Sequence, residues 1–355
     1  MKKYFLLLLL LSLSACRIDP PLYMRPAAVD VIVKVLWKAE VYPDGVKPDG
    51  VTLYFFKEGE FYMQHSTAQV DSCVVKLEPG SYRMYMISQS PDEYGKMDFF
   101  DMTDFESAKV TVGEAETKWY YAADNEILIQ NPEMMTVGVS EEFEVSEDIV
   151  NELNKTKADP GEEEQPETEQ PEGPVVYYTI RVPVDPVSIV SQFWVTIYSD
   201  NADMLKSVRA TTSGMARTFN LTKGTTGDEE GTQVISEWTL TLDDPLTRVG
   251  HLDGKVTTFG FPRGELPSKD RDPSLNVSTL LVDNQTIEDY TFYVGDKITL
   301  EDPPEGYRAL YRLVFGSKKE PAITPAEVVP PEGEPSGFDA TVSDWEDGEV
   351  REIDM

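Results

Sequence analysis

The sequence predicts an all-β protein made of two tandem β-sandwich domains, and three observations support this fold class. Apolar residues alternate with other residues in "VDVIVKVLWK", residues 29–38. Short β-branched and aromatic runs, separated by Gly, Pro, Asn and Asp, fill most of the remaining chain. An acidic, Pro-rich segment at residues 155–174 divides these runs into two groups. Many short strands with frequent turn signals are typical of β-sandwiches, although a barrel gives a similar pattern.

The first domain is predicted at residues 29–154. Val29, Val31, Val33 and Val35 recur at every second position, which indicates a strand with one buried face. The run "VTLYFF" at residues 51–56 is β-branched and aromatic. In "CVVKLEPGSYRMYMIS", residues 73–88, a Glu-Pro-Gly turn joins two further strands, because proline fixes one turn conformation and glycine tolerates a positive φ.

The segment "KTKADPGEEEQPETEQPEGP", residues 155–174, contains seven acidic residues and four prolines. It contains no aromatic residue and no aliphatic residue larger than alanine. Such a composition cannot bury enough apolar surface to offset the entropy of ordering. We therefore expect an extended linker between the two domains.

The second domain is predicted at residues 175–316, followed by a flexible Pro-rich stretch at 317–337 and a C-terminal strand segment at 338–355. The predicted strands of the second domain are residues 175–184, 193–199, 207–212, 217–222, 237–242, 255–261, 278–283, 289–294 and 309–315.

The C-terminal segment has the spacing of a strand, and its candidate strand residues are Phe338, Ala340, Val342, Val350 and Ile353. The stretch at 317–337 can extend to about 60 Å, which is far enough to reach a neighbouring molecule. The segment is therefore either the last strand of its own second domain or a strand donated to another molecule.

The N-terminus resembles the signal peptide and lipobox of bacterial lipoproteins. Two lysines precede an apolar run of about ten residues, which is too short to cross a bilayer as a helix. Leu13, Ser14 and Ala15 then lead directly to Cys16.

The resemblance implies cleavage before Cys16, removal of residues 1–15, acylation of Cys16 by chains such as palmitate, and a tether at residues 16–28. Two or three acyl chains give a durable membrane anchor. The alternative is an ordinary signal peptide with a chance cysteine.

The composition bounds the possible functions. A formal charge of −33 repels phosphate backbones, so nucleic acid is excluded as a partner. The two histidines, His65 and His251, stand outside any recognised catalytic or metal-binding motif, and no phosphate-binding loop is present. With Cys16 acylated, Cys73 has no disulfide partner, and its setting between apolar residues predicts burial rather than a reactive thiol. We expect no enzyme activity, no cofactor and no metal.

Several longer stretches identify a family resemblance: "DGVTLYFF", "LEPGSYRMYMIS", "SVRATTSGMARTFNLTKG", "LLVDNQTIEDYTFYVGDKI" and the terminal "GFDATVSDWEDGEVREIDM". With the lipobox, they resemble the fimbrillin-like and fimbrial-anchor lipoproteins of Bacteroidetes, including a set classed as a domain of unknown function. The resemblance implies transthyretin-like sandwiches, an outer-membrane lipid anchor at the cell surface, and a role in fimbriae or adhesion. Arg17, directly after Cys16, resembles lipoproteins sorted to the outer membrane.

The same family implies a mechanism. Fimbrillins that polymerise lose an N-terminal segment to a protease that cuts after arginine, and the C-terminal strand of the next subunit fills the groove that opens. Arg17 and Arg25 are candidate cut sites, with plain solvent exposure as the alternative. We therefore expect an anchor or accessory subunit that acts through protein-protein contacts. The alternative function is a surface glycan-binding lipoprotein of a polysaccharide uptake system.

Overall fold

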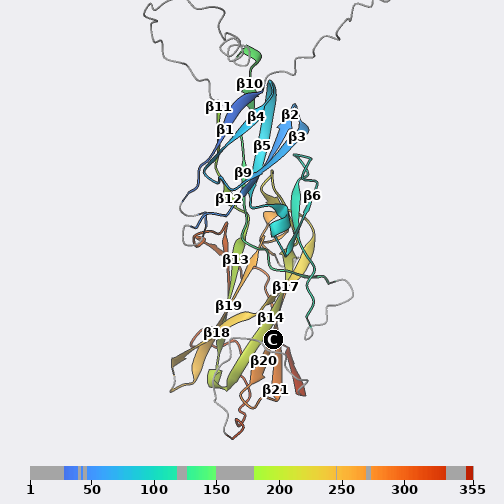
Figure 1. Ribbon diagram of the computed structural model, residues 1–355. Coiled ribbons are helices and arrows are strands. Elements are labelled where there is room, and N and C mark those ends of the chain that lie inside the picture. Colours follow the sequence, from blue (N-terminus) through green and yellow to red (C-terminus); the bar gives the residue numbers. More distant parts are fainter. Residues whose placement is uncertain are drawn as a thin grey trace, which may run out of the picture.

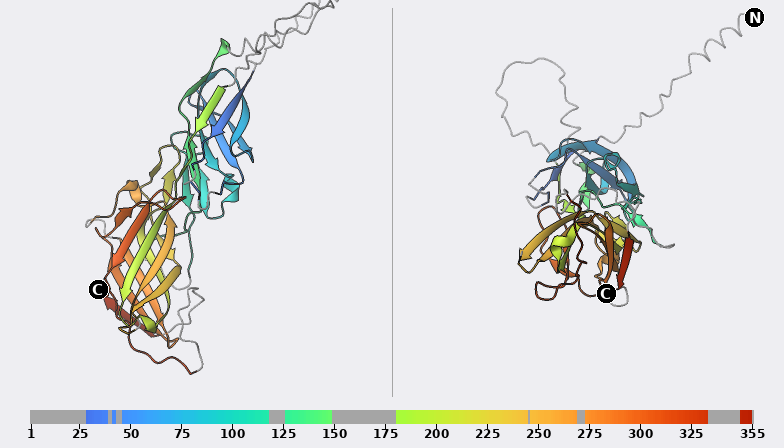
Figure 2. Two further views of the ribbon diagram at one scale, coloured as in Figure 1. Left: turned by 90° about the vertical axis from the view of Figure 1, so that its left-hand side faces the viewer. Right: turned by 90° about the horizontal axis from the view of Figure 1, so that it is seen from below.

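The computed structural model describes residues 28–38, 41–42, 46–117, 126–148, 180–244, 246–268, 273–332 and the backbone of 349–354. This part of the protein is built almost entirely from β-strands. The strands form two β-sandwiches that lie end to end (Figures 1 and 2). The all-β sandwich prediction is confirmed. The short 3-10 turns are η2 (Pro91–Glu93), η3 (Ala202–Met204) and η4 (Pro262–Gly264). Among these residues, no helix is long and apolar enough to span a membrane.

The first sandwich consists of two sheets, named sheet A and sheet B. Sheet A has the strand order β11-β1-β4, with β1 at Val29–Val35, β4 at Ser72–Leu77 and β11 at Ile180–Val184. Sheet B has the order β12-β9-β5-β2-β3, and β10 also pairs with β5. Its strands are β2 (Val51–Lys57), β3 (Glu60–Thr67), β5 (Gly80–Ser88), β9 (Thr136–Val139), β10 (Phe143–Val145) and β12 (Val187–Ser188).

The alternation seen in residues 29–35 explains the position of β1. Its four valines are buried in the core of the first sandwich, while Asp30 and Lys34 are exposed on the other face. β4 alternates in the same way, with Cys73, Val75 and Leu77 buried. Two strands with a period of two therefore place their apolar residues on one shared face.

Strand pairing crosses the predicted boundary at residue 175. β11 pairs in parallel with β1, and β12 pairs with β9, although both strands follow the acidic segment in the sequence. β10 ends at Val145 before this segment and β11 begins at Ile180 after it, so the strands that flank it both belong to the first sandwich. After Ser188 the chain continues into the second sandwich, to which residues 128–129 of β8 also belong. The division into the predicted domains stays a prediction.

The second sandwich consists of sheets D and E. Sheet D has the order β24-β21-β20-β14-β17-β8, and sheet E has the order β18-β19-β13-β23-β22. The strands of sheet D are β8 (Leu128–Ile129), β14 (Leu205–Ala216), β17 (Glu230–Ile235), β20 (Ser274–Leu281), β21 (Thr286–Tyr293) and β24 (Glu349–Asp354). The strands of sheet E are β13 (Ser191–Ser199), β18 (Glu237–Asp244), β19 (Val249–Thr258), β22 (Thr299–Glu301) and β23 (Leu310–Phe315).

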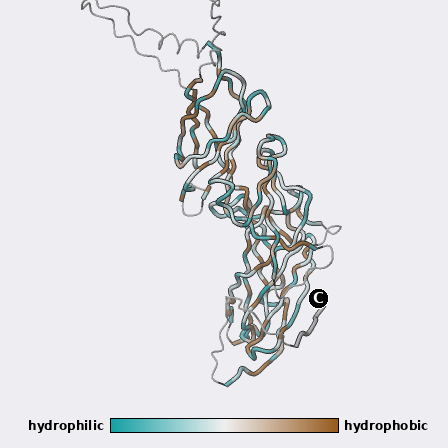
Figure 3. Tube along the Cα trace, turned by 45° about the vertical axis from the view of Figure 1, so that its right-hand side comes forward, coloured by the Kyte–Doolittle hydropathy of each residue, from teal (hydrophilic) through white to brown (hydrophobic). Residues whose placement is uncertain are grey.

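A fifth sheet, sheet C, joins the two halves of the chain. Its order is β16-β15-β7-β6, and its strands are β6 (Met97–Phe100), β7 (Lys109–Val112), β15 (Thr218–Asn220) and β16 (Thr225–Thr226). One hydrophobic cluster runs from Tyr85 and Val110 in the first half to Phe219 and Phe259 in the second. Figure 3 accordingly shows hydrophobic segments in both sandwiches and where they meet. One face of sheet B therefore belongs to the same cluster as the second sandwich, whereas the β1 valines belong to a separate cluster inside the first sandwich.

In sheet E, the Trp238 side chain on β18 packs closely against Gly254 on β19. The buried Trp238 ring covers Gly254, and a Cβ at residue 254 would lie 2.8 Å from ring carbons. The indole Nε1 donates a hydrogen bond to the Ile235 carbonyl at 2.9 Å, which fixes the ring. A side chain at residue 254 would therefore displace Trp238 from this position.

We expect Gly254→Ala to lower the free energy of unfolding by about 1–3 kcal/mol, because overpacking forces the indole or the backbone to move. Gly95→Ala is the matched control, since no atom lies within 4 Å of its Cβ position; its effect should stay within about 0.5 kcal/mol. Urea denaturation measures both. Equal stability of the two variants would contradict the packing described for Trp238.

Candidate functional site

The lipobox residues Leu13, Ser14 and Ala15, the predicted lipid attachment site Cys16, and the candidate cut sites Arg17 and Arg25 lie outside the described part of the chain. The description begins at Ala28, directly before β1. Their roles in lipidation and cleavage stay predictions.

The strand that follows the predicted tether has a partner at both edges. β1 is antiparallel to β4, with Val33 opposite Cys73, and parallel to β11, with Val33 opposite Val182. Cys73 is buried in the same core, and burial raises the pKa of its thiol to about 11. The thiol is therefore protonated at neutral pH and contributes to packing rather than to nucleophilic chemistry.

Three segments meet at the end of the first sandwich that lies farthest from the second sandwich (Figure 1). Val29 at the start of β1 is opposite Leu77, and Val145 at the end of β10 is opposite Gly80. Ile180, where β11 begins, is paired with Val31. The start of β1, the end of β10 and the start of β11 therefore lie at the same end of the first sandwich.

The C-terminal strand β24 occupies an edge of sheet D in its own chain. It pairs in parallel with β21, and Val350 and Ile353 are in register with Ile287 and Tyr290. The other candidate strand residues, Phe338, Ala340 and Val342, lie outside the described residues.

The two histidines take separate positions. His65 lies on β3, at the edge of sheet B, whereas His251 lies on β19 in sheet E. The His251 Nδ1 is 2.8 Å from an Asp243 carboxylate oxygen, and Nε2 is 3.3 Å from Asp253. Lys318 Nζ forms an ion pair with Asp243 at 2.7 Å. Among the described residues, no group of three or more His, Cys, Asp or Glu side chains is arranged so that it could hold a metal ion.

Aromatic side chains do not form one exposed platform among the described residues. The exposed ones, Phe61, Phe100 and Tyr293, belong to sheets B, C and D respectively. Trp194, on β13, is partly exposed, but Lys255 Nζ lies 4.4 Å from its ring centroid. Arg312 lies 5.7 Å from the same centroid. Cations therefore already contact this indole.

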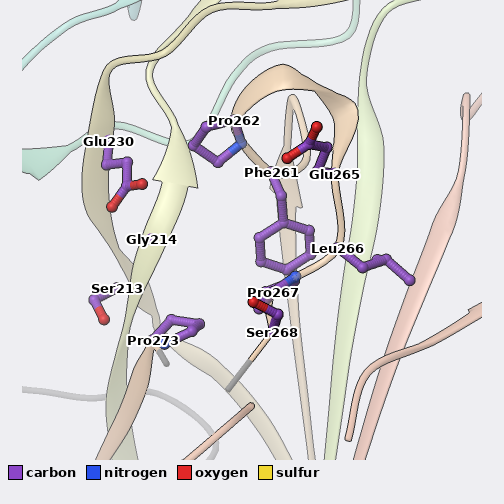
Figure 4. A pocket seen from close by; sticks show the side chains of 10 residues that line it. All are labelled: Ser213, Gly214, Glu230, Phe261, Pro262, Glu265, Leu266, Pro267, Ser268 and Pro273. Carbon is purple, nitrogen blue, oxygen red and sulfur yellow. The ribbon is translucent and has the colours of Figure 1, made fainter. Parts of the chain in front are cut away.

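A pocket of about 360 Å³ lies between the end of β14, the start of β17 and the loop that follows β19 (Figure 4). Its lining residues are Ser213, Gly214, Glu230, Phe261, Pro262, Glu265, Leu266, Pro267, Ser268 and Pro273. The sequence predicts a strand at residues 255–261, but β19 ends at Thr258 and residues 259–261 lead into this loop. The Pro-Arg-Gly turn at residues 262–264 was the available signal.

A protein-family model described as "Domain of unknown function (DUF5119)" matches residues 15–236. No curated protein matches the chain. Among solved structures, a "putative adhesin" from Bacteroides ovatus has 14% sequence identity and a TM-score of 0.53, with 86% of this chain and 94% of that chain covered.

Two further solved structures are similar at lower TM-scores. The fimbrial anchor protein Mfa2 from Porphyromonas gingivalis has 12% identity and a TM-score of 0.38, with 71% of this chain and 78% of that chain covered. A fimbrial assembly protein from Parabacteroides distasonis has 11% identity and a TM-score of 0.34, with 81% and 90% covered.

The ion pairs of Asp243 predict a pH dependence. Burial alone would raise the pKa of this carboxyl, but hydrogen bonds from Lys318 and His251 outweigh it and lower the pKa. The stabilisation is therefore present above the ordinary pKa of about 3.9 and is lost as the pH falls through the lower folded-state value. We expect Asp243→Asn to cost about 1 kcal/mol of stability at pH 7 and less at pH 3.

Urea denaturation at the two pH values measures this difference. Asp302→Asn changes an exposed carboxylate and is the control, for which we expect no pH-dependent difference from the unmodified protein. An effect of Asp243→Asn that is the same at both pH values would contradict the assigned ion pairs.

Proposed function

The chain belongs to the DUF5119 family, and on that premise we propose that it is a lipid-anchored outer-membrane protein that serves fimbria assembly or cell-surface adhesion. In this proposal it is an anchor or accessory subunit, it acts through protein-protein contacts, and it has no enzyme activity. The family match and the fold shared with the Bacteroides ovatus protein support this assignment. The description of that protein as an adhesin points in the same direction.

The position of β1 is the observation that carries the proposal. Strand addition in a polymerising subunit needs a groove, and here β1 fills the space between β4 and β11 with four buried valines. A cut after Arg17 or Arg25 would leave β1 in the chain, because β1 begins at Val29. The next arginine is Arg83, inside β5. A protease specific for arginine therefore cannot release β1 alone.

The C-terminal strand supports the same role. β24 forms a strand ladder with β21 of its own chain, so its backbone hydrogen bonds are made within the molecule. Donation to a neighbouring subunit would require this ladder to break first. The pairing favours a subunit that holds its own C-terminus over one that donates it.

The arrangement of the chain suits a surface protein with an N-terminal anchor. The predicted tether would leave the end of the first sandwich that is farthest from the second (Figure 1). Residues 17–28 could extend to at most about 40 Å. Lipid on Cys16 would then hold the first sandwich near the membrane and leave the second sandwich facing away from it, available to partners.

The glycan-binding alternative has less support. Sugar recognition on a sheet needs exposed aromatic rings on one face, and the exposed aromatic residues described above belong to three different sheets. The Trp194 ring has Lys255 and Arg312 against it. A sugar stacking on Trp194 would compete with these cations.

We expect the protein in native cells to fractionate with the outer membrane and to run as a monomer without a ladder on an unboiled gel. Cys16→Ser should move it to the soluble fraction, because the acyl chains provide the membrane affinity. The double variant Arg17→Ala, Arg25→Ala is the control and should leave the gel pattern unchanged. A ladder that disappears in the double variant would overturn the anchor role in favour of a polymerising subunit.

A further inference from the structure

We propose that the outer face of sheet D, around Thr211 and Arg209, is the docking surface for another segment of the same chain, residues 118–125. This aromatic segment has the sequence "KWYYAADN" and lies outside the described residues. Its docking is independent of the lipid anchor and of the fimbrial role. Three observations support it: the burial of this face, the place where the segment begins and ends, and the chemistry of its side chains.

Two residues of β14 are buried on the face of sheet D that points away from the core. Val208 and Ala210 belong to the main hydrophobic cluster, so Arg209 and Thr211, which alternate with them, point to the opposite face. Thr211 is nevertheless 0% exposed, and Arg209 is 9% exposed. An outward-facing arginine keeps so little exposure only where other residues cover it.

The burial continues across the neighbouring strands β17 and β8. Ile129 belongs to the main cluster, so Leu128 before it points outward, and Thr232 is in register with Leu128 and shares its face. Leu128 is 8% exposed although it belongs to neither hydrophobic cluster, and Thr232 is 1% exposed. The covered area therefore extends from β14 to the β8 edge of the sheet.

The other half of the same face is more open. Asn276 and Ser278 on β20, and Asp289 and Thr291 on β21, are half-buried, and Tyr293 at the end of β21 is 59% exposed. Among the described elements, the main contacts of β14 are with β17 and β20 beside it, with β18 in the facing sheet, and with η4 at its end. The cover therefore lies over the β8 side and comes from residues outside the described ones.

The aromatic segment begins and ends at this side of the sheet. The Ala115 N–H donates to the Leu128 carbonyl at 2.9 Å, and the Thr232 N–H donates to the Ile127 carbonyl at 2.8 Å. A Glu126 carboxylate oxygen accepts a further bond from the Thr232 hydroxyl at 2.5 Å. The residues on both sides of the segment are therefore held at the edge where the burial begins.

The segment is long enough to reach the covered residues. From the spacing of strands and of residues along them, Thr211 lies about 12 Å and Arg209 about 16 Å from Leu128. Residues 116–127 form the connection, and half of this length can extend to about 20 Å. A loop that leaves the edge and folds back over the sheet therefore reaches both side chains.

The chemistry of the segment matches the surface. A guanidinium stacks on aromatic rings, and Trp119, Tyr120 and Tyr121 offer three of them. Burial lowers the pKa of Arg209 to about 10, so a partner with a π face would offset part of the cost of desolvating its charge. Among the described residues, the buried Thr211 hydroxyl has no hydrogen-bond partner. A tyrosine hydroxyl or an indole N–H can supply one.

Hydroxyl-radical footprinting of the full mature chain, read by mass spectrometry, tests the docking without any substitution. After correction for intrinsic reactivity, we expect Trp119, Tyr120 and Tyr121 as a group to oxidise at least fivefold more slowly than the exposed Tyr293. Oxidation of the three residues at the rate of Tyr293 would overturn the proposal.

Phenylglyoxal, which labels accessible guanidinium groups, tests the covered face itself. The triple variant Trp119→Ala, Tyr120→Ala, Tyr121→Ala should raise the labelling rate of Arg209 at least fivefold and leave that of the exposed Arg263 unchanged. Continued slow oxidation of the buried Tyr290 in this variant confirms that sheet D is folded.

The matched control, Phe338→Ala with Trp345→Ala, removes aromatic rings from another segment outside the described residues and should leave Arg209 protected. Exposure of Arg209 in the control would assign the face to the C-terminal segment and overturn the proposal. Labelling of Arg209 that rises on dilution of the unmodified protein would also overturn it, in favour of a second copy of the chain. Continued protection of Arg209 in the folded triple variant would do the same.

Discussion

The parallel pairing of β1 with β11 is the constraint on which the rest of the structure depends. It brings a strand that follows the acidic segment back to the first strand of the fold, with Val31 opposite Ile180 and Val35 opposite Val184. β11 covers one edge of β1 while β4 covers the other. The first sandwich is therefore completed by residues from both sides of the acidic segment.

Packing also joins the two sandwiches. Sheet C forms from strands of both halves, and one hydrophobic cluster continues from one face of sheet B into the second sandwich. The pocket beside Phe261 lies at the end of the second sandwich that adjoins the first, because Thr258 at the end of β19 pairs with Ser191 at the start of β13, shortly after β12.

The sequence was sufficient for the fold class and for many of the strands. The valine alternation at residues 29–35 and the Pro-Gly turn before β5 act through near neighbours, so they are visible in the sequence. The pairing of β1 with β11 joins residues about 150 positions apart and leaves no local signal. The pocket was missed for a similar reason, since it combines a bulge at Gly214, a turn at Pro262 and a proline at residue 273.

Mass spectrometry of the mature N-terminus, on protein taken from the surface of native cells, tests the central claim most directly. The account predicts a chain that begins at an acylated Cys16 and retains Val29–Val35, because β1 is needed to fill sheet A. A mature chain that begins after Val35 would contradict it. In that case β1 would be absent, the space between β4 and β11 would be open, and the protein would have the form of a subunit ready to accept a strand.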